Sequence, residues 1–285
     1  MSINMADFEK LQKVLIATDW YPEVILHGKD YQNLFINRLY RLMLTLTTAE
    51  EKKYFLKIIE NLDVYTLSSY QDMIANIYYE LRLTFQDINK LIVVPLIAPE
   101  DNKSYQIKSG SFVAYLFKSF NFSYIDEKNK FTSIPIEIKS SLKKIDIDNM
   151  KENNKILLVD DFIGSGSQAK GIIEKYRKEG ITPDNTVISS LVCLPQGILQ
   201  IEKLEYQFFY SRIGNTLSSI FSDTRDLQIA RDTNKYLSKY VNARKNYHYG
   251  YKESEALVIL VRTPNNTLPF FWKHKKRKKT AIFER

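Results

Sequence analysis

The sequence predicts an α/β fold with a mostly parallel sheet and a helical N-terminal region. Five short apolar runs, most of them rich in β-branched residues, are spread over residues 91–261. Segments with helical periodicity separate several of these runs, and the first ninety residues carry helical periodicity alone. Strand-helix-strand alternation is typical of a parallel sheet covered by helices.

The N-terminal ninety residues are expected to form helices. From Asp30 to Asp87 apolar residues recur at helical spacing, with charged and amide side chains between them. Thr48 stands three residues before Glu51, which is the pattern of a capped helix start. Ser68 or Ser69 is the expected start of the next helix, because polar first-turn residues follow it.

From residue 90 onward the expected elements are strands and the helices between them. The predicted strands are Leu91–Pro95, Lys155–Val159, Val187–Val192, Tyr206–Tyr210 and Leu257–Val261. The predicted helices are Phe112–Phe120, Gln168–Lys178 and Asp226–Tyr240. The polar, lysine-rich stretch Asp126–Asn154 is expected to be an irregular edge hairpin or a mobile loop over the sheet. We therefore divide the chain into a helical region 1–89, an α/β domain 90–272 and a basic tail 273–285.

Net charge is concentrated at one end of the chain. The formal charge of +8 includes six cations within seven residues, which are Lys273, Lys275, Lys276, Arg277, Lys278 and Lys279. Subtracting six leaves +2 for the rest of the chain, so the tail is the candidate for binding a nucleic acid or an acidic partner. The alternative is a solvated, mobile terminus. The helical N-terminal region is a candidate surface for a protein partner.

Composition also indicates where the protein works. There is no run of 18 apolar residues, the N-terminus lacks the order of a signal peptide, and Cys193 is the single cysteine. A membrane-spanning segment and an internal disulfide are therefore not expected. We expect a cytoplasmic protein that makes no membrane contact.

One segment carries most of the functional information. An apolar run that starts at Ile156 leads into Asp160 and Asp161, and the glycine-serine loop 164–167 then opens a helix. Ligands bind at the carboxyl edge of open α/β sheets, and consecutive backbone N–H groups at a helix start form a nest for phosphate. The two acids can accept hydrogen bonds from adjacent ribose hydroxyls. The pattern therefore predicts a sugar-phosphate site rather than an ordinary polar turn.

Other phosphate-binding patterns fit less well. Gly164 and Gly166 are followed by Ala169, so the dinucleotide-binding spacing is broken, and no Gly-Lys-Ser/Thr triplet closes a P-loop. A response-regulator receiver also has an acidic pair after a strand. That fold requires an Asp at the end of a later strand, where this chain has Pro195 and Gln196.

The segment resembles the diphosphoribosyl-binding signature of type I phosphoribosyltransferases. The resemblance implies a sheet of the phosphoribosyltransferase, or Rossmann-like, type, with Asp160 and Asp161 at the ribose hydroxyls. It also implies that Gly164, Ser165, Gly166 and Ser167 hold the 5-phosphate. Gln168 completes the predicted site, although the family usually has a hydroxyl residue there. A diphosphate loop is implied at Lys108, Ser109 and Gly110, which lead into a helix, with Mg²⁺ carried on the substrate.

The C-terminal segments extend this resemblance. Residues 246–251 and 263–272 look like those of phosphoribosyltransferase-like proteins of bacterial conflict and anti-phage systems. We therefore expect a protein that binds phosphoribosyl diphosphate or a nucleotide and transfers or cleaves at ribose C1. The alternative is a non-catalytic nucleotide sensor or nucleic-acid-associated subunit of a defence complex, which the departure at Gln168 favours.

Three further side chains have a structural and a functional interpretation. His248 lies among tyrosines and is expected to pack or to form hydrogen bonds rather than to catalyse. Cys193 lies within an apolar strand and is expected to be a buried, inert thiol. Trp272 beside Asn265 and Asn266 is interpreted either as a base-stacking residue or as a hydrophobic anchor. No His or Cys cluster has metal-ligand spacing.

Overall fold

The computed structural model describes residues 5–24, 29–98, 108–119, 124–125, 131–275 and 281–283. The chain forms two compact units. Unit 1 combines Met1–Thr66 with Gly214–Arg285, and unit 2 is Leu67–Ile213. These bounds differ from the predicted segments, since residues 67–84 pack with the sheet and residues after 213 pack with the N-terminal helices.

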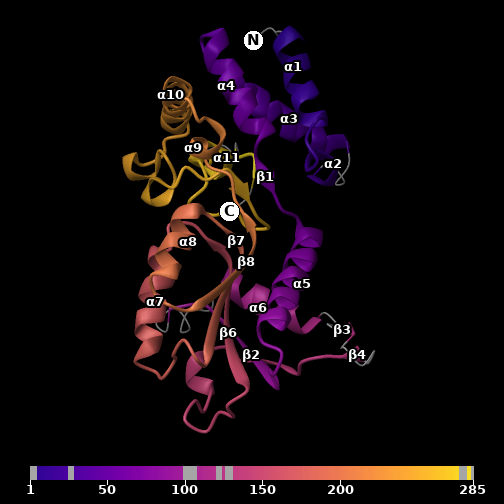
Figure 1. Cartoon of the computed structure of the whole chain (residues 1–285). Helices are drawn as coiled ribbons and strands as arrows, with labels where there is room; N and C mark the ends of the chain where they lie inside the picture. The colour runs from indigo at the N-terminus through magenta and orange to yellow at the C-terminus, as the bar shows by residue number, and fades with distance from the viewer. Residues whose placement is uncertain are drawn as a thin grey trace. The chain divides into compact units, whose positions relative to one another are not determined.

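Unit 2 is built on a five-stranded sheet in which every neighbouring pair is parallel (Figure 1). In spatial order the strands are β5 (Ile136–Ile138), β2 (Lys90–Pro95), β6 (Asn154–Ile163), β7 (Thr186–Cys193) and β8 (Gln207–Ile213). Four of these are predicted strands, and the α/β fold class is confirmed. All eight residues of β7 are buried, as expected for a strand inside a sheet with both faces covered.

Helices cover both faces of this sheet. On one face lie α5 (Leu67–Thr84) and α6 (Ser109–Ser119), and on the other lie α7 (Ser167–Arg177) and α8 (Pro195–Glu202). Alternate residues of β6 point to opposite faces, so Ile156 and Leu158 pack with Ile172 and Ile173 of α7. Apolar side chains therefore dominate both faces of the sheet, with the buried Ser189 and Ser190 of β7 as polar exceptions.

The order of the strands places a switch point between β2 and β6. The chain runs from β2 outward to β5 at one edge, then returns to β6 and continues through β7 to β8 at the other edge. The last pair between β2 and β6 joins Pro95 to Val159, and Asp160 follows immediately. Open α/β sheets bind their ligands at the carboxyl ends of the strands beside such a point.

The region predicted to be irregular contains the edge strand. β5 pairs in parallel with β2, and the 3-10 turn η3 (Leu142–Lys144) follows it. β5 is three residues long and half-buried, which explains why its sequence shows weak periodicity. The short antiparallel pair β3 (Tyr124–Ile125) and β4 (Phe131–Thr132) precedes it, and residues 126–130 lie outside the described ranges.

Unit 1 has a helical core formed by both ends of the chain. Its helices are α1 (Met5–Ile16), α2 (Tyr21–Val24), α3 (Lys29–Met43), α4 (Ala49–Glu60), α9 (Leu217–Ile220), α10 (Thr224–Tyr240) and α11 (Pro269–Trp272). The 3-10 turns η4 (Lys245–Tyr247) and η5 (Tyr251–Glu253) follow α10. The rings of Trp20, Phe35, Phe271 and Phe283 meet in this core. None of the described helices has the length and hydropathy needed to cross a bilayer.

Predictions for the helix starts and for the last strand are settled by the structure. Thr48 caps α4 in a capping box with Glu51, as expected, whereas α5 begins at Leu67, just ahead of the expected Ser68 or Ser69. The predicted strand Leu257–Val261 is not part of the main sheet. It is reduced to β9 (Val258–Ile259), which pairs in parallel with β1 (Asp63–Val64) because the chain after β8 packs with the N-terminal helices.

The end of the predicted basic tail is part of the core of unit 1. Ala281, Ile282 and Phe283 are buried, and the backbone N–H groups of Ile282 and Phe283 both donate to the Phe271 carbonyl at 2.9 Å. Residues 276–280, which include four of the six tail cations, lie outside the described ranges. The expectation of a solvated terminus is therefore wrong for residues 281–283, whose apolar side chains favour burial.

Candidate functional site

Two adjacent acids lie near the carboxyl end of β6. Asp161 is buried at 6% exposure and Asp160 is half-buried. Ser109 Oγ lies 3.3 Å from Asp160 Oδ1, the backbone N–H of Asp161 donates to the same oxygen at 2.9 Å, and the Tyr70 hydroxyl lies 3.5 Å from Asp161 Oδ2. Residues from three separate segments, α5, α6 and β6, therefore meet at the acidic pair. The acids follow the apolar run in sequence but still lie within the strand, since β6 continues through both of them.

Burial sets the ionisation of this pair. Desolvation raises the pKa of Asp160 well above its usual range, and the like charge of Asp161 raises it further. Desolvation also raises the pKa of Asp161, while hydrogen bonds from Ser109 and Tyr70 oppose that shift. Within the described residues, no Lys, Arg or His forms an ion pair with either carboxylate. The site is therefore suited to a ligand that supplies hydroxyl donors or positive charge.

The loop after β6 enters helix α7 through a left-handed glycine. Gly166 is the N-cap of α7 and has φ 72° and ψ −10°, a left-handed conformation that glycine adopts without steric cost. No side chain caps α7 at this residue, and its first turn contains no acidic residue. Ser167 and Gln168 are exposed in that turn. The helix start is therefore electrostatically favourable for an anion.

A second helix supports the loop from behind. A Cβ built on Gly197 in α8 would lie 2.5 Å from the Gly164 carbonyl oxygen and 2.6 Å from that of Ile163. A Cβ on Gly166 would lie 2.7 Å from Gln200 Cβ. The closeness of α8 to the loop therefore depends on glycine at both positions. Sequence reasoning missed Gly197, because its contact partner lies over thirty residues earlier in the chain.

The predicted diphosphate loop lies beside the acidic pair. Ser109 begins α6, and a Cβ on Gly110 would lie 3.0 Å from the Val159 carbonyl oxygen and 3.5 Å from Asp160 Oδ1. Lys108 precedes the helix, and its carbonyl accepts from the Ser111 N–H at 3.0 Å. The structure thus brings Ser109 and Gly110 to the acids, whereas residues 99–107 lie outside the described ranges.

A cavity of about 420 Å³ opens at the carboxyl ends of β2 and β5. Its lining residues are Pro95, Ser111, Ala114, Tyr115, Ile138, Lys139, Ser140 and Lys144. Lys139 also pairs with Glu137 at 2.5 Å. Ser111 lies in the first turn of α6, as does Ser109, although neither Ser109 nor the two acids line the cavity. Sequence reasoning missed Lys139 and Lys144, which lie in the stretch predicted to be irregular.

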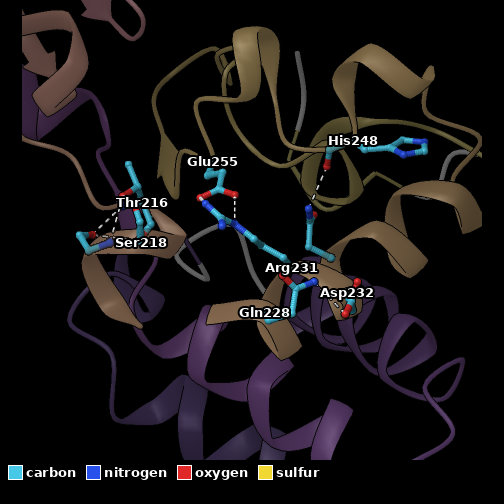
Figure 2. Close-up of polar contacts among 9 residues, drawn as sticks. Thr216, Ser218, Gln228, Arg231, Asp232, His248 and Glu255 are labelled. Atoms are coloured by element: carbon cyan, nitrogen blue, oxygen red, sulfur yellow. Dashed lines mark hydrogen bonds and ion pairs between the residues drawn. The ribbon is translucent and has the colours of Figure 1, made fainter. Parts of the chain in front are cut away.

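The remaining candidates have structural contacts. The His248 carbonyl accepts from Asn234 Nδ2 at 2.9 Å, and in Figure 2 its ring points away from the Arg231–Glu255 ion pair. His248 is buried, as the packing interpretation expects. Burial raises the pKa of the Cys193 thiol, which disfavours a nucleophilic thiolate. Across the described ranges, no three His, Cys, Asp or Glu side chains gather in a way that could hold a metal ion.

Comparison with solved structures finds phosphoribosyltransferases. The chain is similar to an adenine phosphoribosyltransferase from Giardia lamblia complexed with 9-deazaadenine, at 16% identity and a TM-score of 0.28 over 50% of this chain and 80% of that one. It is similar to a xanthine-guanine-hypoxanthine phosphoribosyltransferase from Helicobacter pylori, at 14% identity and a TM-score of 0.31 over 54% and 88%. It is also similar to a Neisseria gonorrhoeae protein with bound ppGpp, at 14% identity and a TM-score of 0.30 over 53% and 84%.

These structural scores are low, so the assignment depends on the family model. Among curated proteins none matches the chain. The model of the PRTase-CE family matches residues 46–285, which include the acidic pair, the loop after β6 and both predicted helix-start sites. Because the match extends over most of the sequence, the chain belongs to the PRTase-CE family.

Proposed function

We propose that this chain binds a phosphorylated ribose, either phosphoribosyl diphosphate or a nucleotide, at the carboxyl edge of the unit 2 sheet. The observation that carries the proposal is the acidic pair of half-buried Asp160 and buried Asp161, followed at once by a loop with a left-handed glycine at a helix start. The acids accept hydrogen bonds from the ribose hydroxyls. The backbone N–H groups of residues 164–168 hold the 5-phosphate.

The diphosphate has a place beside the ribose in this proposal. Lys139 and Lys144 give the cavity of about 420 Å³ a cationic lining, and Ser111 and Ser140 add hydroxyl donors. Lys108 and the N–H groups at the start of α6 complete the set. Charge-assisted hydrogen bonds from lysine to phosphate oxygens are stronger than neutral ones, so this cavity suits the most highly charged part of the substrate.

The chemistry that fits this arrangement is substitution or hydrolysis at ribose C1. As the C1 bond to the leaving group breaks, positive charge develops on the sugar ring, and the carboxylates of Asp160 and Asp161 stabilise it in a site of low dielectric. The cationic cavity stabilises a departing diphosphate. Mg²⁺ typically takes one or two carboxylates together with substrate phosphates, so the acidic pair fits a Mg²⁺ that arrives with the diphosphate and neutralises its charge.

The central test is a pair of matched double variants. Asp160→Asn with Asp161→Asn is expected to abolish binding of ribose 5-phosphate and phosphoribosyl diphosphate, measured by calorimetry. The fold should survive, because an amide removes a charge that burial disfavours. Asp148→Asn with Asp184→Asn removes the same charge from two exposed positions of unit 2 and should bind normally. Equal affinity in the two double variants would place the ligand elsewhere.

Turnover separates the enzyme from a nucleotide sensor. The protein is incubated with phosphoribosyl diphosphate, Mg²⁺ and nucleobases, or with nucleotides alone, and diphosphate and free base are measured. Release that disappears in the Asp160→Asn, Asp161→Asn variant supports an enzyme. Binding without release supports the sensor, which Gln168 favours, because the exposed amide stands where the family usually has a hydroxyl. In that role the N-terminal helices or the basic tail would contact a protein or nucleic-acid partner.

We extend the proposal to an effector role in defence against phage. The C-terminal segments 246–251 and 263–272, which resemble those of conflict-system proteins, support this extension. Cells that express the intact chain should show reduced phage plaquing. Cells that express the acidic-pair variant at equal abundance should not.

A further inference from the structure

A second cavity lies in unit 1 and has a different lining. Its volume is about 250 Å³, and it is lined by Ala243, Arg244, Tyr247, Trp272 and Lys273. Two aromatic rings and two cations thus surround one space, and no acidic residue is among the lining side chains. The volume is slightly below the roughly 300 Å³ at which pockets for drug-sized ligands begin, which suits one flat ring system.

The cavity walls are held by hydrogen bonds within unit 1. Trp272 Nε1 donates to the Thr267 carbonyl at 2.9 Å, which fixes the indole at the end of α11. The Tyr247 N–H donates to the Arg244 carbonyl at 2.8 Å, and its ring centroid lies 6.0 Å from that of Tyr251. Both rings are half-buried, so each retains exposed surface. The indole is held by its own hydrogen bond and the Tyr247 ring by its contact with the Tyr251 ring, so both are positioned to stack with a ligand.

Positive charge continues beyond the cavity. Arg244 is exposed, and Lys273 immediately follows Trp272 in the chain. Two residues further on, Lys275 Nζ lies 3.7 Å from the centre of the Tyr240 ring. Aromatic rings flanked by lysine and arginine are the combination that binds unpaired bases together with their phosphates.

We propose that this cavity binds an unpaired nucleobase, with the adjoining phosphate at Arg244 and Lys273. The base stacks with Tyr247 or Trp272. The ligand is either a free nucleotide or one nucleotide of a single strand, since both present the same base and phosphate. This inference is independent of the sugar-phosphate site of unit 2, because none of its residues belongs to that unit.

The test compares ligands that differ in one property. We would titrate the full chain with AMP, with a single-stranded deoxythymidine 10-mer and with an abasic 10-mer that keeps the phosphates but lacks the bases. Trp272 is one of two tryptophans and the other, Trp20, is buried, so quenching of tryptophan fluorescence reports stacking at Trp272. All titrations are repeated with Asp160→Asn, Asp161→Asn. Persistence of the signal there separates this cavity from the unit 2 site.

Variants then assign the roles of the lining residues. Tyr247→Leu should weaken binding of the base-containing ligand about tenfold, whereas Tyr247→Phe, which keeps the ring, should bind normally. Arg244→Gln with Lys273→Gln should reduce the salt dependence of 10-mer binding by about 1.4 in log–log slope, from about 0.7 for each phosphate contact. Lys10→Gln with Lys13→Gln removes two exposed charges of α1 and should leave both measurements unchanged.

The outcomes are decisive in either direction. Quenching by the 10-mer that the abasic strand does not reproduce, and that is lost in Tyr247→Leu, supports a site for a single strand. The same pattern with AMP alone supports a site for a free nucleotide. Equal affinity for the two 10-mers, or no effect of Tyr247→Leu, would overturn the proposal and leave only charge-driven contact.

Discussion

Replacing Gly197 by alanine tests whether α8 holds in place the loop after β6, to which we assign phosphate binding as a proposal. The new Cβ would lie 2.5 Å from the Gly164 carbonyl oxygen, 2.6 Å from the Ile163 carbonyl oxygen and 3.0 Å from Ile163 Cγ2. The two nearest atoms are backbone atoms and cannot rotate away. Ordinary contact begins at about 3.4 Å, so either the helix or the loop must shift by about 0.9 Å. The loop after β6 would lose its position relative to Asp160.

The expected loss of stability combines two opposing effects. Overpacking of this kind costs about 1–3 kcal/mol, while alanine gains about 1 kcal/mol over glycine in a helix. We therefore expect the free energy of unfolding to fall by up to about 2 kcal/mol, and ribose 5-phosphate binding to weaken with it. Urea unfolding followed by circular dichroism measures the first quantity, and calorimetry measures the second.

Gly171 is a matched control for this prediction. It lies within α7, and a Cβ built on it meets no atom within 4 Å. Gly171→Ala should therefore show only the propensity gain and raise the free energy of unfolding by about 1 kcal/mol. Both glycines are in unit 2, so both variants report the same transition. If Gly197→Ala is as stable as Gly171→Ala and binds ligand normally, the tight contact between α8 and the loop is refuted.

Three further predictions concern the loop, the pH and the tail. Gly166→Val places a branched side chain at φ 72°, so it should lower the free energy of unfolding by about 1–3 kcal/mol and abolish binding of phosphate esters. Binding that calorimetry finds unchanged in this variant would contradict a phosphate nest at the loop. Burial raises the pKa of Asp63 to about 6 from 3.8, so the ionised form is disfavoured in the fold. The contribution of Asp63 to the stability of unit 1 should therefore be greatest below about pH 4. It should decline by about 3 kcal/mol as the pH rises from about 4 through 6, because the folded state then loses a proton that the unfolded state has already lost. Asp63→Asn should flatten that decline in urea unfolding across pH. If all six tail cations contact a single strand, the slope of log K against log salt is about −4, and changing the five from Lys275 to Lys279 to glutamine should bring it to about −1. A slope that stays near −4 in that variant would show that the tail cations do not contact the single strand.

The sequence was most informative where local pattern and tertiary environment agree. β2 and β6 each contain a continuous apolar run, and β7 is buried along its whole length, so the positions of these strands were predicted within a few residues. The edge strand β5 was missed because it is short and half-buried, and its alternation is too brief to detect. β9 was assigned to the wrong sheet, because a short apolar run does not specify its partner.

The same limit applies to the candidate site. Asp160, Asp161 and the loop 164–167 are contiguous in sequence, so their pattern was visible. Tyr70, Gly197 and Lys144 reach the region from α5, α8 and the segment after β5, and their roles depend on packing between distant segments. Nothing in their local sequence marks them. The burial of the acids was also not predicted, because the apolar run of β6 ends before them while the strand itself continues.

That burial bears directly on the function of the pair. Desolvation raises the pKa of both Asp160 and Asp161, so their ionised forms make the fold less stable as the pH rises through those raised values. Asparagine would fill nearly the same space without this cost, and therefore folding alone does not account for two aspartates here. A ligand that brings hydroxyl donors, or positive charge at the sugar, binds best to ionised acids in a site of low dielectric. The feature that makes the unliganded site unfavourable would thus make its interaction with such a ligand strong.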